Sequence, residues 1–136
     1  MAELIGGATA VVSVNSVALS DHATAATLEI SYDDVDTTAF GDAVRTRIAG
    51  LGDATVNITW NQDYASSEID ATFNGIVGTV VAFELTPTSG SVSATNPKYS
   101  GNVLITSYTP ISAEIGALST ITTSWPVSGA LTRATS

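Results

Sequence analysis

Residues 24–35 read TAATLEISYDDV, and this stretch decides the fold class. Apolar residues from Ala26 to Tyr32 fall at every second position, so they lie on one face of an extended chain and polar residues lie on the other. Such alternation predicts a β-strand with one buried face. Residues 54–62, ATVNITWNQ, repeat the same period of two and predict a second strand.

Further short strands are indicated on either side of these two. Asn15-Ser16 separates two β-branched runs within residues 10–19, which predicts a β-hairpin. Pro87, Pro110 and Pro126 each follow an apolar run, and proline ends a strand because it donates no backbone N–H. These runs predict strands at residues 79–86, 99–108 and 117–125, and a short edge strand is expected at residues 130–133.

One helix is expected, at about residues 66–77. Its apolar residues recur at i, i+4, i+7 and i+8, a spacing typical of core packing: Ile69, Phe73, Ile76 and Val77. Ser66 or Ser67 is expected to cap its first turn, and Gly78 to provide a left-handed exit. The predicted fold is mainly β (α+β): one domain over residues 1–136, a two-sheet sandwich or barrel of about seven to eight strands with one flanking helix.

Residues 36–53, DTTAFGDAVRTRIAGLGD, lack a clean period of two and are expected to form a long loop. Loops of this length in compact domains are often functional. Arg45 and Arg47 follow six acidic residues that no Lys or Arg interrupts. Segregated charge of this kind suits contacts between identical copies, because arginine pairs with carboxylates. Salt bridges within one chain are an equal alternative.

The composition excludes several classes of function. The 136 residues carry 13 acidic and 4 basic side chains, for a formal charge of −9, so a stable nucleic-acid binder is not expected. No cysteine is present, which excludes disulfides and thiolate metal sites. The first ten residues lack the basic start and apolar run of a secretory signal, and no segment is apolar enough to span a bilayer. We therefore expect synthesis and folding in a cytoplasm, without membrane contact.

Groups able to perform chemistry are few. Ser20, Asp21 and the single histidine, His22, are adjacent in sequence, but neighbouring residues of an extended segment point to opposite faces and do not form a relay. His22 is expected in a turn or on the surface. The acidic cluster of Asp33, Asp34 and Asp36 does not have the spacing of a calcium loop, so a solvated face or a contact between subunits is favoured. No catalytic, cofactor or metal site is predicted.

Over nearly its whole length the chain resembles the small major tail tube proteins of long-tailed, siphovirus-like bacteriophages and prophages of actinobacteria. No single motif is decisive, but the order of several stretches is fairly specific. They are NSVALSDH at 15–22, TAFGD at 38–42 with RTR at 45–47 and GL at 50–51, NQDYA at 61–65, SATNPKYSG at 93–101, and WPVSG at 125–129.

The resemblance implies a structural virion protein and not an enzyme: hexameric rings stack into a tail tube, whose acidic channel lets DNA pass during ejection without specific binding. It also implies a long loop that stacks the rings, with Phe40, Asp42, Arg45 and Arg47 as candidate contacts. Asp33, Asp34 and Asp36 are candidates for the acidic lumen or a subunit interface. Expected partners are further copies and other tail proteins (tape measure, terminator and distal tail proteins), within the virion tail.

Two other functions remain open. A capsid decoration protein or a tail terminator could share this composition, but neither would form filaments. A carbohydrate-binding β-sandwich would need exposed aromatic residues, whereas Trp60 and Trp125 fall on predicted strands, where core packing is expected.

Overall fold

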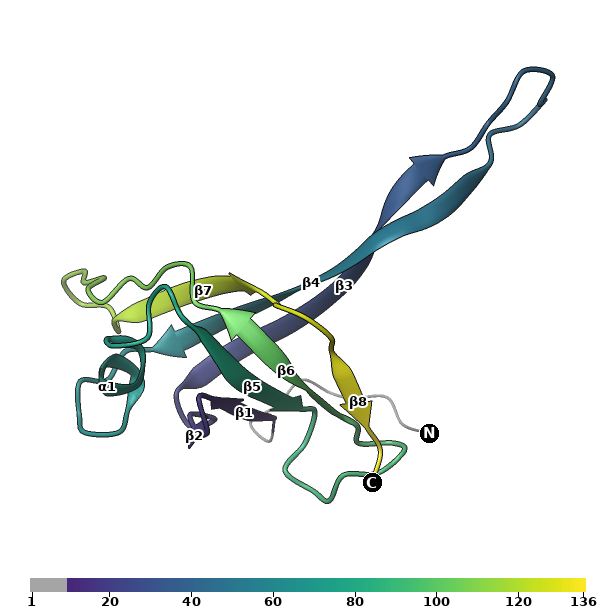
Figure 1. The fold of residues 1–136 in the computed structure, drawn as a ribbon. Helices are drawn as coiled ribbons and strands as arrows, with labels where there is room; N and C mark the ends of the chain where they lie inside the picture. Colours follow the sequence, from purple (N-terminus) through teal and green to yellow (C-terminus); the bar gives the residue numbers. More distant parts are fainter. Residues whose placement is uncertain (1–9) are drawn as a thin grey trace.

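The structure is a computed structural model that describes residues 10–136. Within that range, eight strands form two antiparallel sheets, and one short helix completes the fold (Figure 1). The elements are β1 (Val11–Val14), β2 (Val17–Ala18), β3 (Ala23–Asp36), β4 (Arg47–Asn61), α1 (Ile69–Phe73), β5 (Val80–Thr86), β6 (Lys98–Leu104), β7 (Thr120–Pro126) and β8 (Thr132–Ala134). The predicted mainly β fold is confirmed. Residues 1–9, where no secretory signal is expected, lie outside the described residues.

The core lies between the two sheets, whose strand orders are β2-β1-β5-β6-β8 and β3-β4-β7. Trp60 of β4 and Trp125 of β7 are completely buried, as their positions on predicted strands indicated. Phe73 of α1 packs edge-on against both indoles, with ring centroids 5.3 and 5.2 Å away. Burial of three such rings in one cluster makes α1 part of the core and not a peripheral addition.

The two core indoles and the buried hydroxyl of Thr123 have hydrogen-bond partners. The indole N–H of Trp60 donates to Thr123 Oγ1 at 3.0 Å, and the hydroxyl of Thr123 donates to the carbonyl of Ile58 at 3.3 Å. The indole N–H of Trp125 donates to the carbonyl of Ser107 at 2.9 Å. The first two bonds fix the position of β7 against β4, and the third fixes β7 against the segment after β6, because a buried donor without an acceptor is costly.

The hairpin predicted at residues 10–19 is present. Val14 pairs with Val17, and the two residues between them, Asn15 and Ser16, both have positive φ, at 53° and 65°. Positive φ at both central positions defines the turn that best matches the twist of two paired strands.

The loop expected at residues 36–53 is much shorter, which corrects the prediction. The strands β3 and β4 pair as far as Asp36 and Arg47, so only residues 37–46 connect them. A register shift between Tyr32 and Asp34 places two residues of β4, at positions 50–51, opposite Asp33. Such a bulge shifts the side-chain alternation by one position, which hid the continuing strand from a search for period two.

The helix is also shorter than the predicted 66–77. It runs over Ile69–Phe73 and ends at Asn74, and Glu68 stands at its N-cap without a side-chain cap bond. Ser67 has a φ of +64°, so it lies outside the helix and does not cap it as expected. Gly75 weakens helix continuation. Gly78 does adopt positive φ, at 86°, at the end of the turns that follow.

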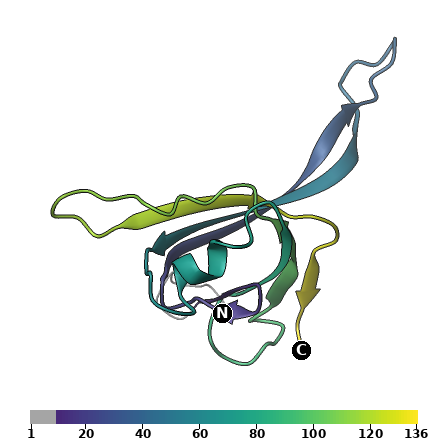
Figure 2. The ribbon, with the colours of Figure 1, turned by 60° about the vertical axis from the view of Figure 1, so that its left-hand side comes forward.

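Two strand boundaries differ from the sequence analysis. The strand β6 ends at Leu104 and not at residue 108, and β7 begins at Thr120 and not at residue 117. A 105–119 segment without regular structure therefore joins them and projects from the body on the side away from the β3–β4 hairpin (Figure 2). In the part of the chain that the structure describes, no helix is long and apolar enough to cross a membrane.

Candidate functional site

The outer half of the β3–β4 hairpin, residues 30–53, projects far beyond the two packed sheets and is here called the arm (Figure 1). Near the body, Val56 and Ile58 of β4 are buried, and their partners Leu28 and Ala26 of β3 share their face. The same face continues outward to Ile30 and Tyr32, which are 54% and 67% exposed. The sequence predicted that Ile30 and Tyr32 would be buried, but no part of the described chain covers them.

Tyr32 partly covers its own strand pair. It lies opposite Gly52, and a Cβ on that glycine would be 2.6 Å from Tyr32 Cε1. The phenol ring therefore lies against the backbone of Gly52, and a larger residue at position 52 would displace the ring.

Beyond the bulge, charged and apolar residues occupy opposite faces of the arm. Val35 pairs with Ile48 on one face, and Asp36 pairs with Arg47 on the other. Arg47 Nε lies 3.3 Å from a carboxylate oxygen of Asp34. Because side chains alternate along β3, Asp34 and Asp36 lie on the same face as Tyr32, and Asp33 lies on the opposite face.

The loop of residues 37–46, here called the tip, is held closed by its own hydrogen bonds. Thr37 N donates to the carbonyl of Thr46 at 2.8 Å, and Ala39 N donates to a carboxylate oxygen of Asp42 at 2.7 Å. Arg45 donates to Asp36 at 3.0 Å. Hydrogen bonds from Thr38, and then from Arg45, hold the pKa of Asp36 below its usual value.

Phe40 stands at the end of this closed tip and is fully exposed. Val44 of the same loop is 74% exposed, and apolar side chains that are exposed together are typical of a contact surface. Of the four residues expected in stacking contacts, Asp42 and Arg45 hold the tip together, Arg47 pairs along the arm, and Phe40 makes no contact of this kind.

The second sheet has one face that the described chain leaves uncovered, here called the polar face. Its central cross-strand pairs are polar: Thr27 lies opposite Asn57, Glu29 opposite Thr55, and Ser31 opposite Asp53. The other members are Ala25, Thr59, Asn61, Thr120, Thr122, Ser124 and Pro126. The face carries two carboxylates, no Lys or Arg, and no large apolar side chain.

The 105–119 segment carries a second exposed apolar group. Ile111, Ile115 and Leu118 are 74%, 104% and 70% exposed. This segment and α1 lie at the end of the molecule opposite the tip (Figure 1). The sequence analysis missed this surface: Leu118 fell within a predicted strand, whereas Ile111 and Ile115 fell between two predicted strands and were given no role.

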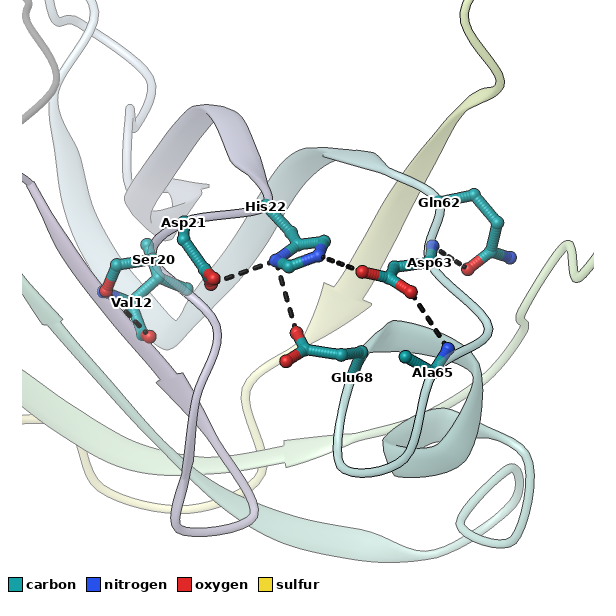
Figure 3. Close-up of polar contacts among 8 residues, drawn as sticks. All are labelled: Val12, Ser20, Asp21, His22, Gln62, Asp63, Ala65 and Glu68. Carbon is teal, nitrogen blue, oxygen red and sulfur yellow. Dashed lines mark hydrogen bonds and ion pairs between the residues drawn. The ribbon is translucent and has the colours of Figure 1, made fainter.

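A polar cluster surrounds His22 where the turn before β3 meets the segment after β4 (Figure 3). Its members, here called the His22 cluster, are Asp21, His22, Asp63 and Glu68. His22 Nε2 donates to Asp63 at 2.7 Å, while Nδ1 lies 2.9 Å from Asp21 and 3.3 Å from Glu68. The hydrogen bond to Asp63, and then the contact with Asp21, raises the pKa of His22 against the opposing effect of burial.

The sequence analysis placed His22 in a turn or on the surface. It does lie at a turn, but its side chain is only 14% exposed, and Asp63 is 41 residues away in sequence. Ser20 does not join it: its hydroxyl bonds to the backbone of Val12. No local pattern in the sequence could have revealed this cluster.

Comparisons with known proteins show the fold. No protein-family model and no curated protein matches the chain. Among solved structures, a chain of the virion of a native gene transfer agent particle superimposes with a TM-score of 0.76, over 96% of this chain and 98% of that one, at 17% identity. A chain from the tail of an empty gene transfer agent particle, determined with helical refinement and C6 symmetry, gives 0.67 over 83% and 82%, also at 17% identity. The chain therefore has the fold of these particle components.

Proposed function

We propose that this protein is a structural subunit of a phage-like tail, in which hexameric rings stack into a tube that conducts DNA. The likeness in fold to a chain of a gene transfer agent tail with C6 symmetry supports this assignment. The virion chain matches along almost the full length of both proteins, so the likeness includes the arm as well as the body.

The observation that carries the proposal is the polar face. A channel for DNA needs a wall that neither binds phosphates nor exposes apolar surface, and phosphate binding depends on Lys and Arg. The polar face offers hydroxyl and amide groups with the carboxylates of Glu29 and Asp53. Alternation extends it along the arm to Asp33. These three residues replace Asp34 and Asp36 as our candidates for the acidic lumen, because the latter two lie on the opposite face with Arg47.

Ring formation would join the two edges of the second sheet. The strands β3 and β7 end the sheet on either side, and neither has an outer partner among residues 10–136. Pairing of β3 in one copy with β7 in the next is a head-to-tail contact, which closes into a ring. Closure also removes exposed strand edges, which otherwise promote aggregation.

Stacking of rings would join the two ends of the molecule. The tip presents Phe40 at one end, and the 105–119 segment presents Ile115 and its apolar neighbours at the other. An apolar group at each end allows a second head-to-tail contact along the tube axis, and a contact of this type that does not close produces a filament.

Negative-stain electron microscopy of the purified protein at rising concentration, with light scattering, tests the assignment directly. Stacked rings with a central channel are expected. Closed rings that never stack would instead favour a tail terminator or a capsid decoration protein. Subunits that stay monomeric at the highest soluble concentration would contradict the proposal.

The lumen assignment has a separate test. Replacing Glu29 and Asp53 with lysine changes the charge of the polar face, with Asp33 included, by four units per subunit, from −3 to +1. Assembled tubes of this variant should retain a short DNA duplex at low salt and release it as salt rises. The matched control, Glu84→Lys with Ser91→Lys and Ala94→Lys, makes the same change of four charge units on β5 and the loop after it, away from the polar face and from both proposed stacking surfaces, and should retain little DNA. Equal retention by both variants would contradict this placement of the lumen.

A further inference from the structure

The His22 cluster has one feature that packing does not explain. His22 Nδ1 is a buried atom without a hydrogen-bond partner, although oxygens of Asp21 and Glu68 lie 2.9 and 3.3 Å away. The two carboxylates approach the nitrogen from Asp21 and Glu68 (Figure 3), but neither forms a hydrogen bond with it. Two anions and a ring nitrogen thus share one small space.

Asp63 determines which ring nitrogen carries the proton in neutral His22. One oxygen of Asp63 accepts Nε2–H at 2.7 Å, and the other accepts the backbone N–H of Ala65 at 2.8 Å. Neutral His22 therefore directs the lone pair of Nδ1 toward two negative oxygens. Three electron-rich atoms facing one another repel, and either a proton on Nδ1 or a metal cation between the three atoms removes the repulsion.

We propose that Asp21, His22 and Glu68 form a binding site for a divalent transition-metal ion such as Zn²⁺. Their ligand atoms all lie within 4.8 Å of one another. A tetrahedral Zn²⁺ site holds neighbouring ligand atoms roughly 3.4 Å apart, so small side-chain rotations suffice. Asp63 acts as a positioning residue, since metal-bound histidines commonly donate their other N–H to a carboxylate.

The ligand types select the class of metal. Imidazole nitrogen suits Zn²⁺ and similar transition metals, whereas Mg²⁺ and Ca²⁺ prefer oxygen ligands alone. The carboxylate of Asp21 is 71% exposed, so the site opens to solvent on that side and an ion can enter. Water can complete the coordination there.

A bound ion would connect parts of the chain that are distant in sequence. Asp21 and His22 precede β3, whereas Glu68 stands at the N-cap of α1. The ion would therefore tie the start of the hairpin that forms the arm to the helix that completes the core. Binding to the folded state alone raises Tm, and the rise grows with the ratio of ion concentration to Kd.

The test uses the full chain freed of metal with a chelator, then titrated with ZnCl₂ at neutral pH by calorimetry. One saturable Zn²⁺ per chain is expected, with a higher Tm and a change in the ¹⁵N signal of His22 Nδ1 but a smaller one at Nε2. His22→Gln and Glu68→Gln should abolish saturable binding. Asp63→Asn should weaken it by about 10- to 100-fold, the range found for such supporting partners.

Glu114→Gln, which removes an exposed carboxylate outside the cluster, is the matched control and should bind as the unmodified chain does. Circular dichroism establishes that each variant is folded. The proposal is overturned if the unmodified chain takes up no Zn²⁺ at millimolar concentration. It is equally overturned if Glu68→Gln, still folded, binds as tightly as the control.

Discussion

Replacing Phe40 with serine should separate assembly from folding. The side chain of Phe40 is fully exposed at the end of the tip, so the free subunit loses no packing when it is removed. Its free energy of unfolding should change by no more than about 0.5 kcal/mol, as for other surface substitutions.

The assembled state should respond much more strongly. Burying a phenylalanine side chain contributes about 1.5–3 kcal/mol, so each tip that docks on the next ring loses that amount in the variant. At about 1.4 kcal/mol per factor of ten, the association constant falls by roughly 10- to 100-fold per contact. In the proposed ring of six subunits this loss is multiplied, so stacking should fail at the lowest concentration at which the unmodified protein assembles.

Sedimentation velocity at several concentrations, with electron microscopy of each sample, measures the effect. Val80→Ser, which removes an exposed apolar side chain of β5, is the control and should stack normally. Tubes of normal length from Phe40→Ser at the concentration where the unmodified protein first assembles would refute the reasoning. So would an equal loss in both variants, since the effect would then not belong to the tip.

Three further predictions concern the fold and the arm. Thr123→Val leaves the buried indole N–H of Trp60 without its acceptor and should lower the free energy of unfolding by about 1–3 kcal/mol, measured by chemical denaturation. The same change at exposed Thr122 should lower it far less. Equal losses of stability in the two variants would contradict this role of Thr123. Burial raises the pKa of Tyr108 to about 12, so the folded chain holds a proton that the unfolded chain releases near pH 10. Stability should therefore fall as pH rises from about 10 to 12, and Tyr108→Phe should lack this slope in denaturation curves. Replacing Arg45 and Arg47 with glutamate should block stacking in electron micrographs while circular dichroism stays unchanged, and normal tubes would count against it.

The period-two alternation of apolar residues predicted burial correctly wherever the chain covers its own apolar face. Val56, Ile58 and Trp60 alternate in sequence and are buried in the structure. Ile30 and Tyr32 alternate just as clearly and remain exposed. Alternation shows that a strand has one apolar face, but it does not show whether the same chain or another copy covers that face.

Local exceptions account for the remaining differences. The bulge opposite Asp33 breaks the period and made a strand look like a loop. The positive φ of Ser67 at one end and Gly75 at the other shorten a helix whose apolar spacing predicted three turns. His22 and Asp63 are 41 residues apart in the sequence and meet only in the folded chain, so no local sequence motif could predict their contact.

The hydrogen bonds that close the tip bear on how quickly assembly can proceed. A loop that becomes ordered only on contact loses conformational entropy at that moment, which weakens and slows association. Here the Thr37 amide, the Asp42 carboxylate and the Asp36–Arg45 pair already fix the tip in the isolated subunit. The barrier to adding a ring should then lie in orientation and encounter and not in local folding. Growth of such a polymer would be controlled by when its first ring forms, because every later addition meets a surface that is already in its final shape.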